Sequence, residues 1–148
     1  MQEPLKLNFP TLELRLREVE GVRYAWSEPR RQWLVLTPEE WVRRHLVAFL
    51  VARCGAQPLR IVEEYPVPLN GQPQRADVVV VDDAGRPLLL AECKAPDVKI
   101  SQGVYDQAVR YNAVLGARFV VLTNGCRHYC YEQEKGAYRA INSFPNLG

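Results

Sequence analysis

The sequence lacks the features that would place the chain in a membrane, on a secretory route or around a zinc ion. None of its apolar runs approaches the roughly 20 residues needed to cross a bilayer. The first residues form no apolar signal-peptide segment. The 4 cysteines form no Cys-x-x-Cys pair, and the 2 histidines lie far apart. We therefore expect reduced thiols, no zinc, no membrane partner and a cytoplasmic protein.

Several enzyme motifs are also missing. There is no phosphate-binding glycine loop, no Gly-x-Ser-x-Gly elbow and no His-Glu-x-x-His, so a nucleotide cofactor, a serine hydrolase and a zinc protease lack support. The net charge of +2 is too small to indicate nucleic acid by itself. A length of 148 residues with a hydrophobic fraction of 47% instead indicates one ordinary globular domain with a real core.

Two apolar segments joined at Ala84-Gly85 form the part of the sequence around which the rest is organised. Residues 78–81 are four valines, and residues 88–91 read Leu-Leu-Leu-Ala. Continuous apolar runs bounded by turn residues are typical of strands buried on both faces. A hairpin folded about this turn would place Val81 opposite Leu88. An ionisable residue at the end of such strands is costly to bury unless it is paired or binds something.

The position of the turn also predicts which charged residues meet. Folding about Ala84-Gly85 places Asp77 opposite Glu92, and directly opposed side chains in an antiparallel pair have Cβ atoms about 5 Å apart. Two carboxylates at that separation can share a divalent cation. Lys94 lies two residues beyond Glu92 and shares its face, whereas the Cys93 side chain points away. We therefore predict that Asp77, Glu92 and Lys94 converge on one patch, which a slip of one residue would disperse.

A helix is predicted from Thr37 to about Arg53. Thr37 is a favourable N-cap, Pro38 occupies the preferred first position, and Glu40 completes a capping box. Gly55 lies just beyond the end of the helix, where glycine is favoured. Glu40 has two interpretations: it is the capping partner alone, or it also contributes to an active site.

A second hairpin brings another carboxylate towards the first two. Asn70-Gly71 is a strong turn signal between a strand over residues 58–67 and the strand that begins near Arg75. Folding about this turn places Glu64 opposite Asp77. Glu64 is therefore a candidate third carboxylate, and an ion pair with Arg75 is the alternative.

The second half of the chain predicts a parallel crossover. Residues 101–115 form an amphipathic helix, and residues 118–123 form a buried strand. A strand, a helix and a strand in this order favour a right-handed parallel unit within a mixed sheet. Asn124-Gly125 then turns the chain into an edge strand over residues 127–131.

Together these elements predict a single α/β (α+β) domain, in which helices flank a mixed β-sheet. The expected order is α-β-β-β-α-β-β over residues 37–141. Residues 1–36 are expected to form an irregular N-terminal arm with at most a short strand, anchored on the body by Trp26 and Trp33. Residues 142–148 are expected to form a frayed C-terminal tail.

Two carboxylates and a lysine at the end of a hairpin match the needs of phosphodiester hydrolysis. That reaction requires a divalent metal, an activated water and positive charge near the developing phosphorane. Mg²⁺ keeps several waters and takes only one or two carboxylates, so Asp77 and Glu92 suffice, with the Cys93 backbone carbonyl as a third ligand. Lys94 would orient the attacking water or offset transition-state charge. The alternative is an ion-pair cluster without metal.

Several blocks of the sequence resemble one nuclease family. In their order along the chain they are similar to the nuclease domain at the N-terminus of type I restriction enzyme R (HsdR-type) subunits. That domain belongs to the PD-(D/E)xK, or restriction-endonuclease-like, superfamily, and the resemblance extends over about residues 25–131. The blocks are residues 36–43, Glu64, and residues 75–80, 91–96, 105–112 and 122–125.

The resemblance implies a mixed central sheet flanked by helices, with the active site at the edge of the sheet. Asp77 and Glu92 match the two carboxylates of the superfamily, and Lys94 matches the catalytic lysine. Glu40 matches a first-helix acid that joins the metal site in some members, and Glu64 is a further candidate ligand. The name of the superfamily shows proline immediately before the first carboxylate, where this sequence has alanine.

The same comparison implies residues that support the site or face DNA. Gln107 and Tyr111 match a Gln-x-x-x-Tyr element of related nucleases, and a spacing of four places them on one face of a helix. Arg75 and Asn124 lie in the matching blocks next to the expected site. We expect these four residues to surround the carboxylates.

The leading hypothesis is a DNA endonuclease that uses Mg²⁺, with Mn²⁺ expected to substitute. The alternative is a non-catalytic nucleic-acid-binding or accessory module that retains the nuclease fold. Full R subunits continue into an ATP-driven motor, and this sequence has no Walker-type loop. A separate motor or specificity protein is therefore a candidate partner beside DNA, and a homodimer is another.

Overall fold

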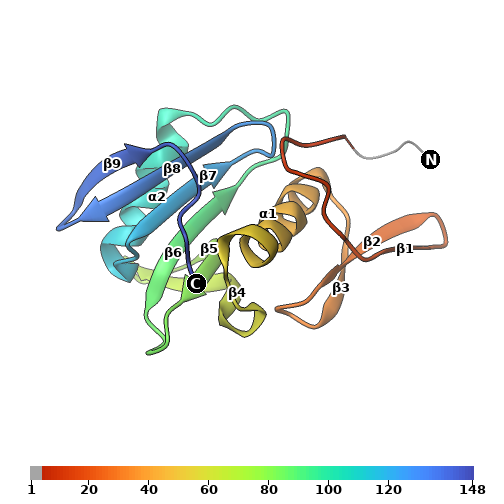
Figure 1. Ribbon diagram of the computed structural model, residues 1–148, viewed down its shortest axis with the longest axis horizontal. Helices are drawn as coiled ribbons and strands as arrows, with labels where there is room; N and C mark the ends of the chain where they lie inside the picture. The colour runs from red at the N-terminus through yellow and green to blue at the C-terminus, as the bar shows by residue number, and fades with distance from the viewer. Residues whose placement is uncertain (1–4) are drawn as a thin grey trace.

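The computed structural model describes residues 5–148, and its centre is a six-stranded mixed β-sheet with one helix on each face (Figure 1). Helix α1 (Pro38–Cys54) covers one face and α2 (Gln102–Leu115) covers the other. The predicted fold class is confirmed. The strands lie side by side in sequence order: β4 (Ile61–Leu69), β5 (Gln72–Val81), β6 (Pro87–Cys93), β7 (Phe119–Thr123), β8 (His128–Glu134) and β9 (Ala137–Ile141).

Two apolar cores, one on each face, hold the helices on the sheet. Val42, Leu46 and Leu50 of α1 are fully buried against β5, β6 and β7. On the other face, Ala108 and Tyr111 of α2 pack against the same strands. Because β5, β6 and β7 are covered on both sides, they need the continuous apolar sequences that identified them.

The predicted parallel crossover is present. β6 and β7 pair in parallel, and α2 connects them across one face of the sheet. Gly116 ends α2 in the left-handed conformation, with φ of 71°, which glycine adopts without steric cost. The crossover places the end of β6, with Glu92 and Cys93, beside the end of β7.

Both hairpin registers are confirmed, with one local shift. Around Asn70-Gly71, Tyr65 pairs with Ala76 and Glu63 pairs with Val78, so Glu64 and Asp77 lie at matching positions. In the next hairpin, Val78 pairs with Ala91, which places Asp77 opposite Glu92. Near the turn, the predicted pairing of Val81 with Leu88 is wrong: a bulge shifts Val81 onto Pro87. The first strand of the pair also starts later than predicted, after a 3-10 turn over Pro58–Arg60.

Strand β4 twists sharply at Glu64, which has a positive φ of 55°. Before this residue, Glu63 faces α1; after it, Tyr65 packs in the core under α2. In the partner strand, β5, the side chains also change from one face of the sheet to the other at Asp77. Ala76 belongs to the α2 core, whereas Val78 belongs to the α1 core. A left-handed conformation is uncommon for a residue other than glycine and costs about 1–3 kcal/mol, and such strain is often found at functional sites.

The expected N-terminal arm contains more structure than predicted. It forms a separate antiparallel sheet of β1 (Leu16–Val19), β2 (Val22–Ser27) and β3 (Gln32–Val35), which lies beside α1 (Figure 1). The Ser27 hydroxyl donates a hydrogen bond to Glu63 and joins this sheet to the body. Trp26 and Trp33 instead pack against each other, with ring centroids 5.3 Å apart.

The C-terminal part also differs from expectation. β8 was predicted to be an edge strand, but β9 pairs outside it and forms the edge. The tail is not frayed: Phe144 and Leu147 pack on the α1 core, and the Leu147 N–H donates to the carbonyl of Cys54. Within residues 5–148, no helix is long and apolar enough to span a membrane.

Candidate active site

The structure brings Asp77 and Glu92 together where β5 and β6 run beside the start of α1. The register places the two residues opposite each other, and their carboxylates interact electrostatically. Lys94, two residues after Glu92, contributes its positive charge to the same group. The register thus brings Asp77 and Glu92 together, and Lys94 follows Glu92 by two residues.

Glu92 is the most unusual carboxylate of this group. It is only 6% exposed, and its Oε1 atom is buried with no hydrogen-bond partner in the part of the chain that the structure describes. Burial, followed by the proximity of Asp77, raises the pKa of Glu92 far above its usual value. An orphaned carboxylate oxygen inside a protein is costly, and a bound cation would relieve that cost.

Cys93 orders the first carboxylate through its backbone. The Cys93 N–H donates to Oδ2 of Asp77 at 2.7 Å, whereas the Lys94 N–H donates to the Thr123 carbonyl on the opposite side. In a trans peptide, the carbonyl of one residue points opposite to the N–H of the next. The Cys93 carbonyl therefore points away from β7, towards the side on which Asp77 lies.

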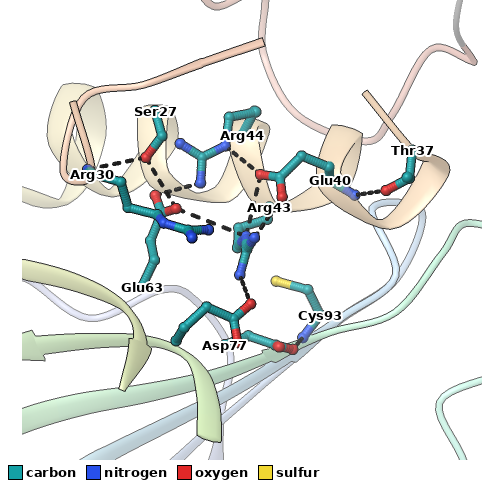
Figure 2. A network of polar contacts seen from close by, with 10 residues as sticks. Ser27, Arg30, Thr37, Glu40, Arg43, Arg44, Glu63, Asp77 and Cys93 are labelled. Atoms are coloured by element: carbon teal, nitrogen blue, oxygen red, sulfur yellow. Dashed lines mark hydrogen bonds and ion pairs between the residues drawn. The ribbon is translucent and has the colours of Figure 1, made fainter. Parts of the chain in front are cut away.

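A buried network of charges lies between this group and the N-terminal sheet (Figure 2). Arg43 donates to Glu40 at 2.5 Å and to Glu64 at 2.6 Å. Arg44 pairs with Glu40 at 2.7 Å and also contacts Glu63, whose side chain is fully buried. Burial disfavours the charged form of Arg43, but the carboxylates around it outweigh burial and raise its pKa. The network fixes α1 on β4.

Glu40 therefore does not form the predicted capping box. The Thr37 side chain does cap the helix, accepting from the Glu40 N–H at 3.0 Å, but the Glu40 carboxylate turns towards Arg43 and Arg44. Burial would raise the pKa of Glu40, and the two guanidinium groups more than offset it, so that the pKa is lowered. Two charged partners at i+3 and i+4 outcompete one backbone N–H.

The neighbouring acid, Glu39, was not singled out from the sequence. It is exposed in the first turn of α1, where partial burial and then the charge of Asp77 raise its pKa. Lys94 acts on it in the opposite direction. Glu39 thus lies within electrostatic reach of the candidate site, while Glu40 points into the network. The sequence feature that could have identified Glu39 is the pair of adjacent acids at the start of the helix.

Glu64 lies at the matching position across from Asp77, as its register predicted, but its carboxylate is bonded to Arg43. The alternative pairing with Arg75 is wrong, because Arg43 takes that place. Arg75 itself is exposed on β5.

The remaining predicted residues support the surroundings of the site. Gln107 donates to the Tyr111 hydroxyl at 2.8 Å, and that hydroxyl donates to Gln74 of β5 at 3.0 Å. Partial burial, and to a smaller extent the charges of Glu92 and Asp77, raise the pKa of Tyr111. Asn124 is buried, and its amide bonds the carbonyl of Val98 and loop N–H groups.

The donors fit a hard, oxygen-preferring cation. Among residues 5–148, no three His, Cys, Asp or Glu side chains are grouped so that they could hold a metal ion. Mg²⁺ accepts such a sparse set, because it retains several waters and is bound by one or two carboxylates. The orphaned Oε1 of Glu92 and the neighbouring carboxylate of Asp77 supply that number.

Comparison with known proteins found one matching family and a solved structure with a similar fold. The family model described as type I restriction enzyme R protein N terminus (HSDR_N) matches residues 38–145. A solved fragment assigned as an HsdR subunit of a type I restriction enzyme from Vibrio vulnificus YJ016 has a similar fold, with a TM-score of 0.56 and 23% identity. The similarity covers 75% of this chain and only 24% of that fragment. No curated protein matches the chain.

Proposed function

Because the chain belongs to the family of type I restriction enzyme R protein N termini, we propose that it is a divalent-metal-dependent deoxyribonuclease. The carrying observation is the buried Glu92 carboxylate, which lies against a second carboxylate, Asp77, and not against a cation. A structural ion pair joins a buried carboxylate to a cation, as Glu63 is joined to Arg44, whereas two adjacent carboxylates are suited to share a divalent metal.

In this proposal, Asp77 and Glu92 hold Mg²⁺, and Mn²⁺ substitutes for it. The Cys93 carbonyl, directed towards the Asp77 side of β6, is the third protein ligand. The bound metal would supply an acidified water and neutralise phosphate charge. Glu39 is a further acid close enough to influence the site. Glu40 and Glu64 act on the site indirectly, because both form ion pairs with Arg43.

Lys94 has the role of a cation at the scissile phosphate. It follows Glu92 by two residues and shares its face, so the ammonium group and the carboxylates act on the same small volume. There it orients the attacking water and offsets the charge of the phosphorane. Gln107 and Tyr111 of α2 lie near the carboxylates, and the exposed Arg75 would contact DNA.

DNA is the proposed substrate, and other proteins are proposed partners. The similar Vibrio fragment is assigned to a type I restriction enzyme subunit, so a motor or specificity protein is a candidate partner of this chain as well. A homodimer would supply the second site that a double-strand cut requires.

A plasmid assay tests the proposal. Wild-type protein is incubated with supercoiled DNA and with single-stranded DNA in Mg²⁺, in Mn²⁺ and in EDTA, beside Asp77→Asn and Lys94→Ala. The matched controls are Asp106→Asn and Lys99→Ala, which alter exposed residues that are not among the proposed site residues. We expect metal-dependent cutting that both site variants lose by at least about a hundredfold and both controls retain.

Two outcomes would contradict this proposal. Cutting that survives in both site variants would mean that a contaminant is responsible. DNA binding without any cutting by the wild type would instead favour the non-catalytic accessory module.

A further inference from the structure

The N-terminal sheet presents one outward face that has no counterpart in the family match. β1 to β3 span residues 16–35, and the matched region begins at residue 38. Side chains alternate across a strand, so Ala25 and Ser27, which are buried, define the inward face of β2. Tyr24 and Trp26 consequently lie on the outward face.

The same register assigns neighbouring residues to that face. Trp33 pairs with Trp26, and Arg17 pairs with Tyr24. Arg15 lies opposite Trp26, because the Trp26 N–H donates to its carbonyl at 2.9 Å. We call this surface the Arg–Trp face; its members are Arg15, Arg17, Tyr24, Trp26 and Trp33.

The two arginines lie over the indole rings. The Arg15 guanidinium carbon lies 4.8 Å from the centre of the Trp26 ring, and that of Arg17 lies 4.5 Å from the centre of the Trp33 ring. A cation–π contact of this kind stabilises by about 0.5–1 kcal/mol when exposed. A guanidinium group that lies over an aromatic ring can still donate hydrogen bonds from its N–H groups.

The two arginines of this face lack direct ion-pair partners in the described part of the chain. Within residues 5–148, neither Arg15 nor Arg17 forms an ion pair. The nearby acid, Glu28, bonds instead to Arg31 at 2.5 Å and to the Trp26 indole N–H at 2.8 Å. The face therefore combines two arginines that lack ion pairs among the described residues with three aromatic rings, and arginine side chains lie over the rings of Trp26 and Trp33. Unstacked bases can stack on guanidinium planes as well as on aromatic rings.

A groove lies between the N-terminal sheet and the loop after β6. The groove has a volume of about 690 Å³, and Val22 and Val35, on the outward side of the sheet, are among the residues that line it. Pro96 and Asp97, two and three residues after Lys94, also line it.

We propose that the Arg–Trp face binds an unpaired nucleic-acid strand. Arginine donors match phosphate oxygens, and aromatic side chains on an open sheet match the faces of unstacked bases. A duplex keeps its base faces stacked inside, so it can use only the arginines. The proposal goes beyond the nuclease function, because it concerns binding without metal by residues outside the family match.

Fluorescence anisotropy in EDTA tests the proposal without cleavage. The full chain is titrated into a labelled single-stranded DNA, a single-stranded RNA and a DNA duplex of the same sequence. The test variant is Arg15→Gln with Arg17→Gln. The matched control is Arg118→Gln with Arg139→Gln, two exposed arginines that pair with Glu132 on the far strands.

We expect the wild type to bind the single strands more tightly than the duplex. The Arg15 and Arg17 variant should bind them at least about tenfold more weakly, and its salt dependence should fall by about 1.4 in the log–log slope, about 0.7 for each lost phosphate contact. The control should bind as the wild type does. Equal affinities for the single-stranded DNA and the single-stranded RNA would show that the face recognises phosphate and base rather than the sugar.

A second variant keeps the test decisive if the first is unstable. Val35→Glu adds a carboxylate beside the arginines at a position that is already 54% exposed, and it should also weaken strand binding. Binding within twofold of the wild type for both variants would overturn the proposal, as would a preference for the duplex. No oligonucleotide binding at all would point to a protein occupant instead. Because the titrations contain EDTA and measure binding alone, their outcome is separate from that of the nuclease test.

Discussion

The backbone N–H of Cys93 donates a 2.7 Å hydrogen bond to Oδ2 of Asp77 and thereby ties the first carboxylate to the strand that carries the second. This contact gives one oxygen of Asp77 a hydrogen-bond donor. Glu92 immediately precedes Cys93, and its Oε1 atom has no hydrogen-bond donor among the described residues. The two carboxylates are therefore unequal. One is positioned by the protein, and the other lacks a ligand that would satisfy it.

Replacing Glu92 by glutamine should stabilise the metal-free protein. Glu92 is only 6% exposed, and its raised pKa means that the folded protein must bind a proton there at neutral pH, whereas a neutral amide of the same shape needs none. We expect Glu92→Gln to raise the free energy of unfolding by roughly 1–3 kcal/mol at neutral pH in EDTA. Urea denaturation measures it. Asp106→Asn, on an exposed helix face, should leave the stability unchanged.

The stability of the metal-free wild type should fall as the pH rises. The pKa of Glu92 is raised in the folded state, so the stabilising proton is fully bound below the ordinary value of 4.5 and is lost as the pH rises through the folded value. Relative to Glu92→Gln, we expect a loss of up to about 1.4 kcal/mol per pH unit above 4.5. Equal pH profiles for the two proteins would show that Glu92 is not the titrating group.

Substitutions of the adjacent acids Glu39 and Glu40 should have different effects, one on the affinity for Mg²⁺ and the other on stability. Glu39 acts on Asp77 and Lys94, so Glu39→Gln should change the affinity for Mg²⁺ by severalfold with little change in stability. Glu40→Gln leaves Arg43 and Arg44 with weaker partners and should cost about 1–3 kcal/mol of stability. Calorimetry and urea denaturation of both variants decide this, and a reversed pattern would contradict the assignment.

Arg44 should be the most sensitive residue of the buried network. Its loss leaves Glu63, whose side chain is fully buried, with only a 4.0 Å contact to Arg43 and the hydroxyl of Ser27. We expect Arg44→Met to cost about 3–5 kcal/mol, and the double variant with Glu63→Met to recover part of it. Arg53→Met, an exposed residue in the last turn of the same helix, is the control.

The core of the fold could be predicted because its turns fixed the register. Asn70-Gly71 and Ala84-Gly85 each placed the strands correctly over most of their length, and the carboxylates followed from that register. The bulge beside Val81 could not be foreseen, because it depends on how the turn residues bond: Asp82 accepts from the N–H groups of Ala84 and Arg86.

The missed strands share one physical cause. Glu20-Gly21, Asn70-Gly71 and Lys135-Gly136 all turn with two positive φ values, but only the second pair carries the asparagine that usually marks such a turn. The N-terminal sheet and β9 were therefore not predicted. The sequence also could not show that Glu40 prefers two buried arginines to the helix cap, because that choice depends on burial against β4.

Calorimetric titration of the wild type and of Glu92→Gln with Mg²⁺ tests the central claim most directly. Binding at the Asp77–Glu92 pair predicts one site in the wild type, release of a proton as Glu92 ionises, and loss of the binding in the glutamine variant. Equal binding by both proteins, or no binding by the wild type, would contradict the assignment and leave the two carboxylates as an ion-pair cluster with Lys94.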